Sequence, residues 1–389
     1  MAELNRRHLM MGSGALASTA MLGLAPGCSR PSAWLTERIA GLPAEHGFPG
    51  MTAGITLTGG ETLTAAAGLA DRETGEAMTP AHVMAAGSTG KTFVAAGAVD
   101  LVLRGELDLD APVGTWLSDR DWFSDLAHAD AITPRLLLLH RSGIAEYYAQ
   151  ESFVRAHSER LATDPDRAFA TDETIPIALA AGPVFEPDTG FSYADTNYLL
   201  IGLIIEAITG TSYEDHVRTR LLEPHGLTQG ILAPQSRVIP GLASSYMEQG
   251  AFGVPSKAAD GGVIAMHPMT EWTGGGMTTR ADALSRWGHV WFGGRAFDTA
   301  YSAMIRQAPQ GSSVIQLEGE DWRYGMGCEM RLDPGPRFIG HRGWFPAFMS
   351  VLCYRDDLDM SVALQFNQVP SAPGLYTLAN TLMDEAAAL

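Results

Sequence analysis

The sequence predicts a protein of the mixed α/β (α+β) class, with one antiparallel sheet built from both chain ends, flanking helices and a large, mostly helical insertion. Strand-like alternation dominates the residues just after position 50 and returns from about residue 322, and runs with helical spacing lie between. A chain of 389 residues with 46% hydrophobic content can bury the core of such a domain. We therefore assign residues 31–389 to one domain, with the sheet in about 31–84 and 320–389 and the helical region in about 85–319.

A short helix and a hairpin are expected first. Residues 32–41 can form the helix. From Gly50 the sequence MTAGITLTGGETLTAAAGLAD alternates between apolar and polar residues, and Gly59 with Gly60 interrupts it as a turn signal. Antiparallel strands therefore begin the domain.

Three helices are expected in the middle of the chain. One of about 16 residues follows Ser88, where FVAAGAVDLVLRGEL keeps helical spacing. Thr133 and Pro134 are residue types preferred at the N-cap and first position of a second. The third, TNYLLIGLIIEAITG, begins at Asp195 and closes at Gly210.

Strand patterns return near the C-terminus. They are the stretches WRYGMGCEMRL, RFIGH, FMSVLCYR and MSVALQFNQ, separated by turn-like sequences such as DPGP and DDLD. The last stretch, GLYTLANTLMDEAAAL, has the pattern of an amphipathic closing helix.

The first residues, 1–28, have the pattern of an export signal. Arg6 and Arg7 precede an Ala/Gly-rich run without charge, and this pair suggests the twin-arginine route. An uncleaved anchor is the alternative, because the run is about as long as a membrane span. Cys28 closes the sequence LAPGC, which resembles a lipoprotein cleavage site with Ala25 in place of the usual Leu. We expect a periplasmic or cell-envelope protein, which a lipid on Cys28 would attach to the membrane.

The net charge and the absence of metal-binding motifs argue against nucleic acid and metal ions as partners. A net charge of -18 and no basic run argue against nucleic acid. No motif has metal-ligand spacing, and we expect neither a metal nor another cofactor. Cys328 and Cys353 lie in expected strands, where they form a disulfide if the strands are neighbours or remain buried thiols.

The stretch AAGSTGKTF, residues 85–93, permits two interpretations. Ala85 to Thr92 fits a loose phosphate-binding loop, and Ser88 with Lys91 fits the S-x-x-K spacing of a serine nucleophile and its base. A phosphate loop needs a buried parallel strand before it, yet a hairpin and TPAHVM precede this one. The helix start and burial both disfavour an ammonium at Lys91, so this lysine can take the Ser88 proton.

Three motifs in order resemble those of the serine beta-lactamase and penicillin-binding superfamily: Ser88 to Lys91, SYADTNY at 192–198 and GHRG at 340–343. The resemblance is strongest to the branch of class C beta-lactamases, D-alanyl-D-alanine carboxypeptidases, D-aminopeptidases and beta-lactamase-like esterases. It extends from about Gly50 to the C-terminus and implies a beta-lactamase-like fold.

By this resemblance, Ser88 is the nucleophile, Lys91 its activator and Tyr193 a phenol or phenolate that relays the proton to the leaving group. Asp195 departs from the Asn that the family often has there. An ionised Asp cannot donate to a substrate carbonyl, so amide recognition is in doubt. Capping the following helix is an equally good interpretation of Asp195.

The third motif implies the substrate-binding strand. His341 faces the nucleophile and can hold a proton or a substrate oxygen. Gly343 lets a substrate lie along the strand edge, and the Trp344 N–H is the second oxyanion donor beside that of Ser88. Strand alternation turns Arg342 to the opposite face, where a surface or core-edge role is expected.

The sequence therefore predicts an exported serine hydrolase that forms an acyl-enzyme at Ser88. Its expected partner is a small-molecule or peptidoglycan-derived substrate: a D-alanine peptide or related D-amino-acid amide, a beta-lactam, or a small ester. The alternative is a non-catalytic envelope protein that keeps the fold and binds ligands. Asp195 and the aromatic residues that follow Gly343 tilt the choice of substrate toward esters, whereas export to the cell envelope favours peptidoglycan-derived peptides.

Overall fold

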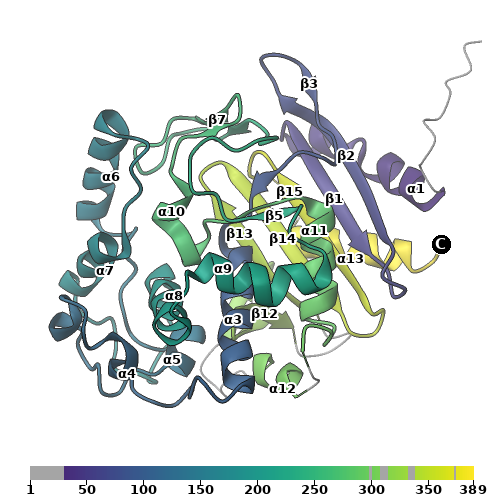
Figure 1. Ribbon diagram of the computed structural model, residues 1–389. Helices are drawn as coiled ribbons and strands as arrows, with labels where there is room; N and C mark the ends of the chain where they lie inside the picture. Colours follow the sequence, from purple (N-terminus) through teal and green to yellow (C-terminus); the bar gives the residue numbers. More distant parts are fainter. Residues whose placement is uncertain (1–29, 298–299, 307–313, 332–337, 372–373) are drawn as a thin grey trace, which may run out of the picture.

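The computed structural model describes residues 30–297, 300–306, 314–331, 338–371 and 374–389. Its main feature is a nine-stranded antiparallel sheet in the order β10-β11-β12-β13-β14-β15-β1-β2-β3 (Figure 1). The strands are β1 (Gly50–Thr56), β2 (Thr62–Asp71), β3 (Glu76–Ala77), β10 (Val314–Leu317), β11 (Glu320–Gly325), β12 (Cys328–Arg331), β13 (Phe338–Phe345), β14 (Phe348–Arg355) and β15 (Met360–Phe366).

The two ends of the chain meet where β1 pairs with β15, from Met51 opposite Phe366 to Thr56 opposite Ser361. The expected hairpin is confirmed, because β1 also pairs with β2 and the turn between them contains Gly60 at φ 82°. The predicted two-ended antiparallel sheet is therefore confirmed. Its C-terminal part begins slightly earlier than expected, since β10 starts at Val314.

Helices cover both faces of this sheet (Figure 1). α1 (Arg30–Ile39) and α2 (Leu42–His46) come before the first strand, and α13 (Leu375–Ala386) follows the last one. α1 and α13 share a core with the sheet face that presents Ile55 and Leu364. α11 (Ala281–Trp291) packs on the opposite face, so closely that a Cβ at Gly54 would lie 2.4 Å from the Ala281 carbonyl oxygen. Alternate residues of the central strands therefore enter two separate cores.

The region between the two halves of the sheet is mostly helical, as predicted. Its helices are α3 (Lys91–Leu103), α4 (Gly114–Leu117), α5 (Pro134–Leu138), α6 (Glu151–Thr163), α7 (Thr171–Ala180), α8 (Asp195–Thr209), α9 (Tyr213–Val217), α10 (Pro268–Glu271) and α12 (Tyr301–Ile305), besides α11. The sequence did not predict its two small three-stranded sheets, made of β4 (Met84–Ala85), β9 (Thr278–Thr279) and β5 (Ile231–Leu232), and of β6 (Ser245–Tyr246), β7 (Lys257–Asp260) and β8 (Val263–Ile264). Strands this short leave no period to detect.

The start of α3 differs from the prediction. Ser88 lies in a 3₁₀ turn, Gly87–Gly90, and the α-helix begins only at Lys91. The positive φ of 54° at Gly87 sets the entry into this turn. Two predicted helix ends are confirmed: the Thr133 side chain accepts a hydrogen bond from Leu136 N, and Gly210 ends α8 at φ 66°.

Cys328 and Cys353 are buried free thiols. The first lies on β12 and the second on β14, and β13 runs between these two strands. The condition for a disulfide, neighbouring strands, is therefore not met. Cys28 and the predicted export signal at 1–28 lie outside the described residues. Among those that are described, no helix has the length and apolar character needed to cross a membrane.

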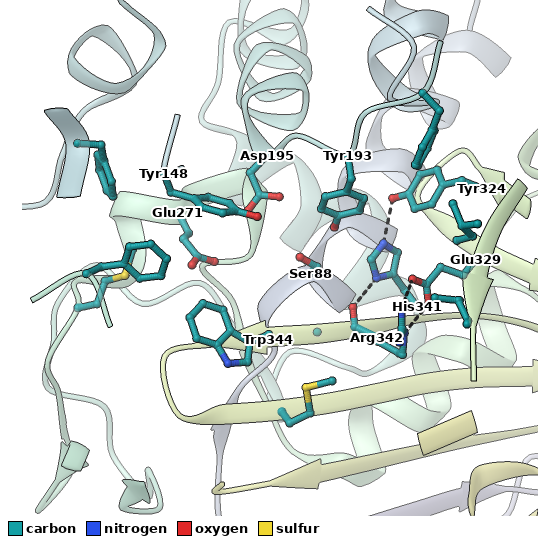
Figure 2. Close-up of a pocket in the computed structure, with 18 residues that line it drawn as sticks. Ser88, Tyr148, Tyr193, Asp195, Glu271, Tyr324, Glu329, His341, Arg342 and Trp344 are labelled. Atoms are coloured by element: carbon teal, nitrogen blue, oxygen red, sulfur yellow. Dashed lines mark hydrogen bonds and ion pairs between the residues drawn. The ribbon is translucent and has the colours of Figure 1, made fainter. Parts of the chain in front are cut away.

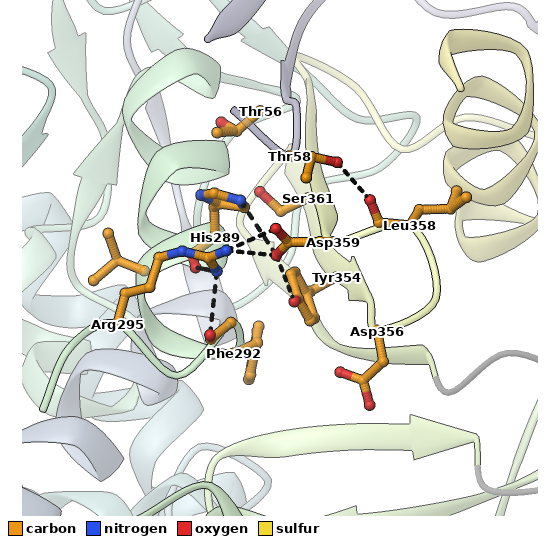
Figure 3. Close-up of polar contacts among 12 residues, drawn as sticks. Thr56, Thr58, His289, Phe292, Arg295, Tyr354, Asp356, Leu358, Asp359 and Ser361 are labelled. Atoms are coloured by element: carbon orange, nitrogen blue, oxygen red, sulfur yellow. Dashed lines mark hydrogen bonds and ion pairs between the residues drawn. The ribbon is translucent and has the colours of Figure 1, made fainter. Parts of the chain in front are cut away.

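A polar cluster fastens the end of α11 to the turn between β14 and β15 (Figure 3). Asp359 in this turn accepts two hydrogen bonds from the Arg295 guanidinium, each of 2.7 Å, and one of 2.8 Å from the Tyr354 hydroxyl. His289 of α11 lies 3.5 Å from the same carboxylate. One carboxylate thus joins the helical region to the sheet hairpin.

Replacing Asp359 by Ala is expected to lower the free energy of unfolding by about 1–3 kcal/mol, because it leaves the Tyr354 hydroxyl and the Arg295 guanidinium without their acceptor. Urea unfolding measures the change. Asp119→Ala, which removes an exposed carboxyl, serves as the control and should change the value by less than about 0.5 kcal/mol. Equal stability of the two variants would contradict the role of the cluster.

Candidate active site

A cavity of about 430 Å³ opens between β13 and the helical region (Figure 2). All the residues that the sequence assigned to substrate contact or to nucleophilic attack line it, except the fully buried Lys91. The lining residues are Ser88, Tyr148, Phe153, Phe191, Tyr193, Asp195, Phe252, Met266, Glu271, Ile315, Leu317, Tyr324, Glu329, His341, Arg342, Gly343, Trp344 and Met349.

Lys91 lies at the centre of the polar contacts beneath the cavity. Its Nζ donates hydrogen bonds to Ser88 Oγ over 2.9 Å and to the Gly274 carbonyl oxygen over 2.5 Å. It also forms an ion pair with Asp195 Oδ1 at 2.5 Å. Ser88 and Lys91, which the sequence predicted to act together, are thus in direct contact, and Asp195 contacts the same amine.

The N-cap interpretation of Asp195 is wrong. Ala194 holds the N-cap position of α8, and Asp195 is the first helical residue. Its side chain turns away from the helix end toward Lys91 and is 3% exposed. Burial raises the pKa of Asp195, and Lys91 acts in the opposite direction.

Tyr193 places its phenol above the nucleophile. Its hydroxyl points toward Ser88 (Figure 2), and Lys91 Nζ lies 4.9 Å from the ring centroid. Burial and then the nearby Asp195 raise the pKa of Tyr193 well above its ordinary value, so the resting residue is a phenol and not a phenolate. His140 holds this loop, with its ring 4.2 Å from that of Tyr193 and Nδ1 accepting from Ala194 N over 3.2 Å.

Two further carboxyls lie near Lys91, and the sequence did not predict either. Glu146 accepts a hydrogen bond from Asp195 N, and burial followed by the Asp195 charge raises the pKa of Glu146 well above its ordinary value. Burial and Asp195 also raise the pKa of Glu271, to about 8. Glu271 precedes the run Gly274 to Gly276, but one acidic residue without a spaced partner gives no signal in a sequence.

The edge of β13 approaches the turn that holds the nucleophile closely, at Gly343 and Trp344. A Cβ at Gly343 would lie 1.9 Å from the Ala86 carbonyl oxygen, and a Cβ at Gly87 would lie 2.6 Å from Trp344 N. Glycine is therefore required on both segments. These contacts bring the Trp344 amide beside the turn that holds Ser88, the arrangement that two oxyanion donors need.

His341 faces the cavity as predicted, but it cannot be a resting cation. Its Nε2 lies 2.9 Å from the Tyr324 hydroxyl and its Nδ1 lies 2.5 Å from the Arg342 carbonyl oxygen. Burial lowers the pKa of His341 to about 4. At neutral pH this imidazole is therefore uncharged and carries a single N–H.

Arg342 does line the cavity, although the sequence predicted a surface or core-edge role on the opposite strand face. β12 pairs with β13 only from Phe338 to Gly340, so the following residues of β13 have no strand partner on that side within the described parts of the chain, and they line the cavity. The Arg342 guanidinium donates two hydrogen bonds of 3.2 Å to the buried Glu329 carboxylate. Its charge is thus already paired.

The fold and the Ser-Lys-Tyr arrangement are typical of serine hydrolases that form an acyl-enzyme. Across the described parts of the chain, no group of three or more His, Cys, Asp or Glu side chains is placed to hold a metal ion. A family model described as Beta-lactamase matches residues 35–387. The chain therefore belongs to the beta-lactamase family of serine hydrolases, which confirms the predicted superfamily and fold.

The relatives that this chain resembles have names that state different activities. The chain is 32% identical over 211 residues to penicillin-binding protein 4 of Amycolatopsis lactamdurans, a match that covers 54% of this chain and 52% of that protein. It is 25% identical to a D-aminopeptidase of Gluconobacter oxydans, covering 88% and 60%, and 33% identical to esterase EstB of Burkholderia gladioli, covering 42% and 41%. The matches span less than two thirds of each relative's length.

Solved structures support the same fold. The D-amino acid amidase of Ochrobactrum anthropi SV3, complexed with D-phenylalanine, superposes with a TM-score of 0.74 at 23% identity over 92% of this chain and 99% of that one. A D-stereospecific amidohydrolase of a Streptomyces species gives 0.73 at 23% identity, covering 90% and 97%. At this identity the likeness establishes the fold alone.

Gly343→Ala is expected to lower the free energy of unfolding by about 1–3 kcal/mol, since its methyl group would overlap the Ala86 carbonyl and force β13 away from the Ser88 turn. Thermal and urea unfolding measure this. Gly59→Ala is the matched control, because a Cβ there meets nothing within 4 Å. The close-approach argument fails if the two variants are equally stable.

Proposed function

We propose that the protein hydrolyses small esters or amides through an acyl-enzyme on Ser88. The observation that supports this most directly is the line of contacts from Ser88 Oγ through Lys91 Nζ to Asp195 Oδ1, with separations of 2.9 Å and 2.5 Å. Such a line activates a hydroxyl that is otherwise a weak nucleophile.

In the acylation step, Ser88 Oγ attacks the substrate carbonyl carbon and passes its proton to Lys91. Lys91 must be an uncharged amine at that moment, and Asp195 can hold the proton that the ammonium gives up. The Tyr193 phenol donates its proton to the leaving oxygen or nitrogen as the carbonyl bond to that atom breaks, and regains one from Lys91. Water then attacks the acyl-enzyme by the same steps in reverse.

Backbone amides stabilise the oxyanion in this proposal. The Ser88 N–H and the Trp344 N–H lie on the two segments that Gly87 and Gly343 allow to meet. Fixed donors directed at the developing negative charge need no rearrangement during the reaction.

Charge pairing on the side of His341 favours substrates without a carboxylate on the leaving group. His341 is uncharged there, and Glu329 already pairs with Arg342. A beta-lactam or a D-alanyl peptide would bring a carboxylate to this side and find no free cation among the described lining residues. While ionised, Asp195 also cannot donate to a substrate amide carbonyl. Simple esters meet neither obstacle, and simple amides avoid the first.

Ser88→Ala is expected to lower kcat/KM for p-nitrophenyl ester hydrolysis by a factor of about a thousand or more, because the nucleophile is lost. The same comparison with a chromogenic cephalosporin and with D-alanine release from a peptide ranks the three substrate classes. The mechanism is wrong if Ser88→Ala keeps full activity on a substrate that the wild type turns over.

Intact-mass analysis after incubation with a fluorophosphonate provides the control for this experiment. The wild type should gain one adduct and Ser88→Ala none. If the wild type gains no adduct and hydrolyses none of the substrates, the non-catalytic binding protein becomes the better account.

Tyr193→Phe is expected to slow cleavage of an alkyl ester or an amide by a factor of about 100 or more, and that of a p-nitrophenyl ester much less. The reason is that p-nitrophenolate can leave without being protonated, whereas an alkyl alcohol or an amine needs a proton in order to leave. Tyr198→Phe is the control: this ring also lies near Lys91 Nζ, at 5.4 Å, but its hydroxyl donates to the Leu138 carbonyl oxygen. Equal losses on both kinds of leaving group would contradict the relay.

We further propose, on the pattern of residues 1–28 alone, that the protein is exported to the periplasm or cell envelope. The paired Arg6 and Arg7 support the twin-arginine route, and a lipid on Cys28 would add membrane attachment. An envelope location makes peptidoglycan-derived amides and esters available as substrates.

A further inference from the structure

The two sides of the cavity differ in their chemistry (Figure 2). Tyr193, Tyr324 and His341 lie together on one side, with the His341 ring 6.1 Å from that of Tyr193 and 5.7 Å from that of Tyr324. Asp195 and Glu271 lie on the other side of Ser88. Because Tyr193 protonates the leaving group in the proposed mechanism, the side of Glu271 is the one that receives the acyl part of the substrate.

Glu271 is a buried carboxyl group with no paired cation among the described residues. Its side chain belongs to a residue that is 6% exposed, it lines the cavity, and no hydrogen bond or ion pair joins it to any described residue. The backbone leaves room for it at Gly275, where a Cβ would lie 2.5 Å from Glu271 Oε2. An unpaired buried carboxylate costs stability, so a partner from outside the protein is the natural complement.

Lys91, the buried cation beside Ser88, is not available to pair with Glu271. Lys91 Nζ is already bound to Ser88, to the Gly274 carbonyl and to Asp195. Burial and the Asp195 charge raise the pKa of Glu271 to about 8, which shows how poorly its negative charge is compensated in the empty cavity. A bound cation would reverse this effect.

Aromatic rings surround the same part of the cavity. Phe252 links two of them, with its ring centroid 5.9 Å from that of Tyr148 and 6.0 Å from that of Trp344, both in edge contact. Burial raises the Tyr148 pKa above its ordinary value, and the charges of Asp195, Glu146 and Glu271 add to this effect. Aromatic faces beside a carboxylate are the surroundings that an organic ammonium prefers.

We propose that Glu271, with Asp195 behind it and the rings of Tyr148, Phe252 and Trp344 around it, binds a positively charged ammonium group in the acyl part of the substrate. The proposal rests on the proposed function and narrows its substrates to esters and amides of amino acids whose amino group is free. A metal ion is a poorer occupant, because the described residues offer no group of three or more metal-ligating side chains here.

Two p-nitrophenyl esters test the proposal because they have the same shape and differ in charge at every pH. One carries trimethylammonioacetate and the other 3,3-dimethylbutanoate as the acyl group. The readout is the ratio of kcat/KM for the cationic ester to that for the neutral ester. Comparing this ratio between variants cancels the greater intrinsic reactivity of the cationic ester.

Glu271→Gln is expected to lower this ratio by about tenfold or more relative to the wild type, since it removes the charge and keeps the shape. The control is Glu206→Gln on α8, a half-buried glutamate outside the cavity whose Oε1 accepts from Tyr213 N over 3.0 Å. Its ratio should stay within about twofold of the wild type. An unchanged ratio in Glu271→Gln overturns the ammonium site and leaves the hydrolase intact.

Calorimetry with Ser88→Ala separates the two proposals and does not depend on the folding of Glu271→Gln. The ligands are the amides of the same two acids. The cationic amide should bind about tenfold more tightly or better. Equal affinities overturn the ammonium site. If the wild type hydrolyses neither ester while the cationic amide binds more tightly, the hydrolase proposal fails and the ammonium site stands.

Discussion

A lysine side chain with no exposed surface fixes the rest of this site. An isolated ammonium in such a position would cost several kcal/mol, and three contacts offset that cost: the Ser88 hydroxyl, the Gly274 carbonyl and the Asp195 carboxylate. These groups come from the turn before α3, from the glycine run and from the start of α8. The nucleophile is therefore positioned by the same interactions that allow Lys91 to be buried, and the segments cannot shift independently.

The sheet supplies the other half of the site, and its topology explains why both chain ends are needed. β13 lies within the C-terminal strands, which are joined to the N-terminal hairpin through the pairing of β15 with β1. Gly87 and Gly343 then let the Ser88 turn contact the edge of β13 backbone to backbone. Since β12 stops pairing at Gly340, the next residues of β13 keep an edge that a substrate can approach.

Local patterns in the sequence were enough for most of the fold. The hairpin around Gly60, the helix after Asp195 and the C-terminal strands follow from periodicity and turn residues, and the ordered motifs located Ser88, Lys91 and Tyr193. What could not be predicted depends on burial and on contacts between distant segments. Helix-end preferences favoured a cap as one of two interpretations of Asp195, whereas the buried Lys91 pairs with its side chain. The unpaired Glu271 has no local signal at all.

The two sides of the cavity also differ in how their charges are paired, and this difference affects which substrates the site can bind. On one side each formal charge has a partner, because Arg342 pairs with Glu329 and His341 is uncharged. On the other side, Glu146, Asp195 and Glu271 all lie near one cation, Lys91, whose charge lowers the pKa of each of the three carboxyls. A charged ligand gains most where the protein has left a charge unpaired. The acyl side therefore selects for positive charge, while the leaving-group side discriminates mainly by shape and hydrogen bonding.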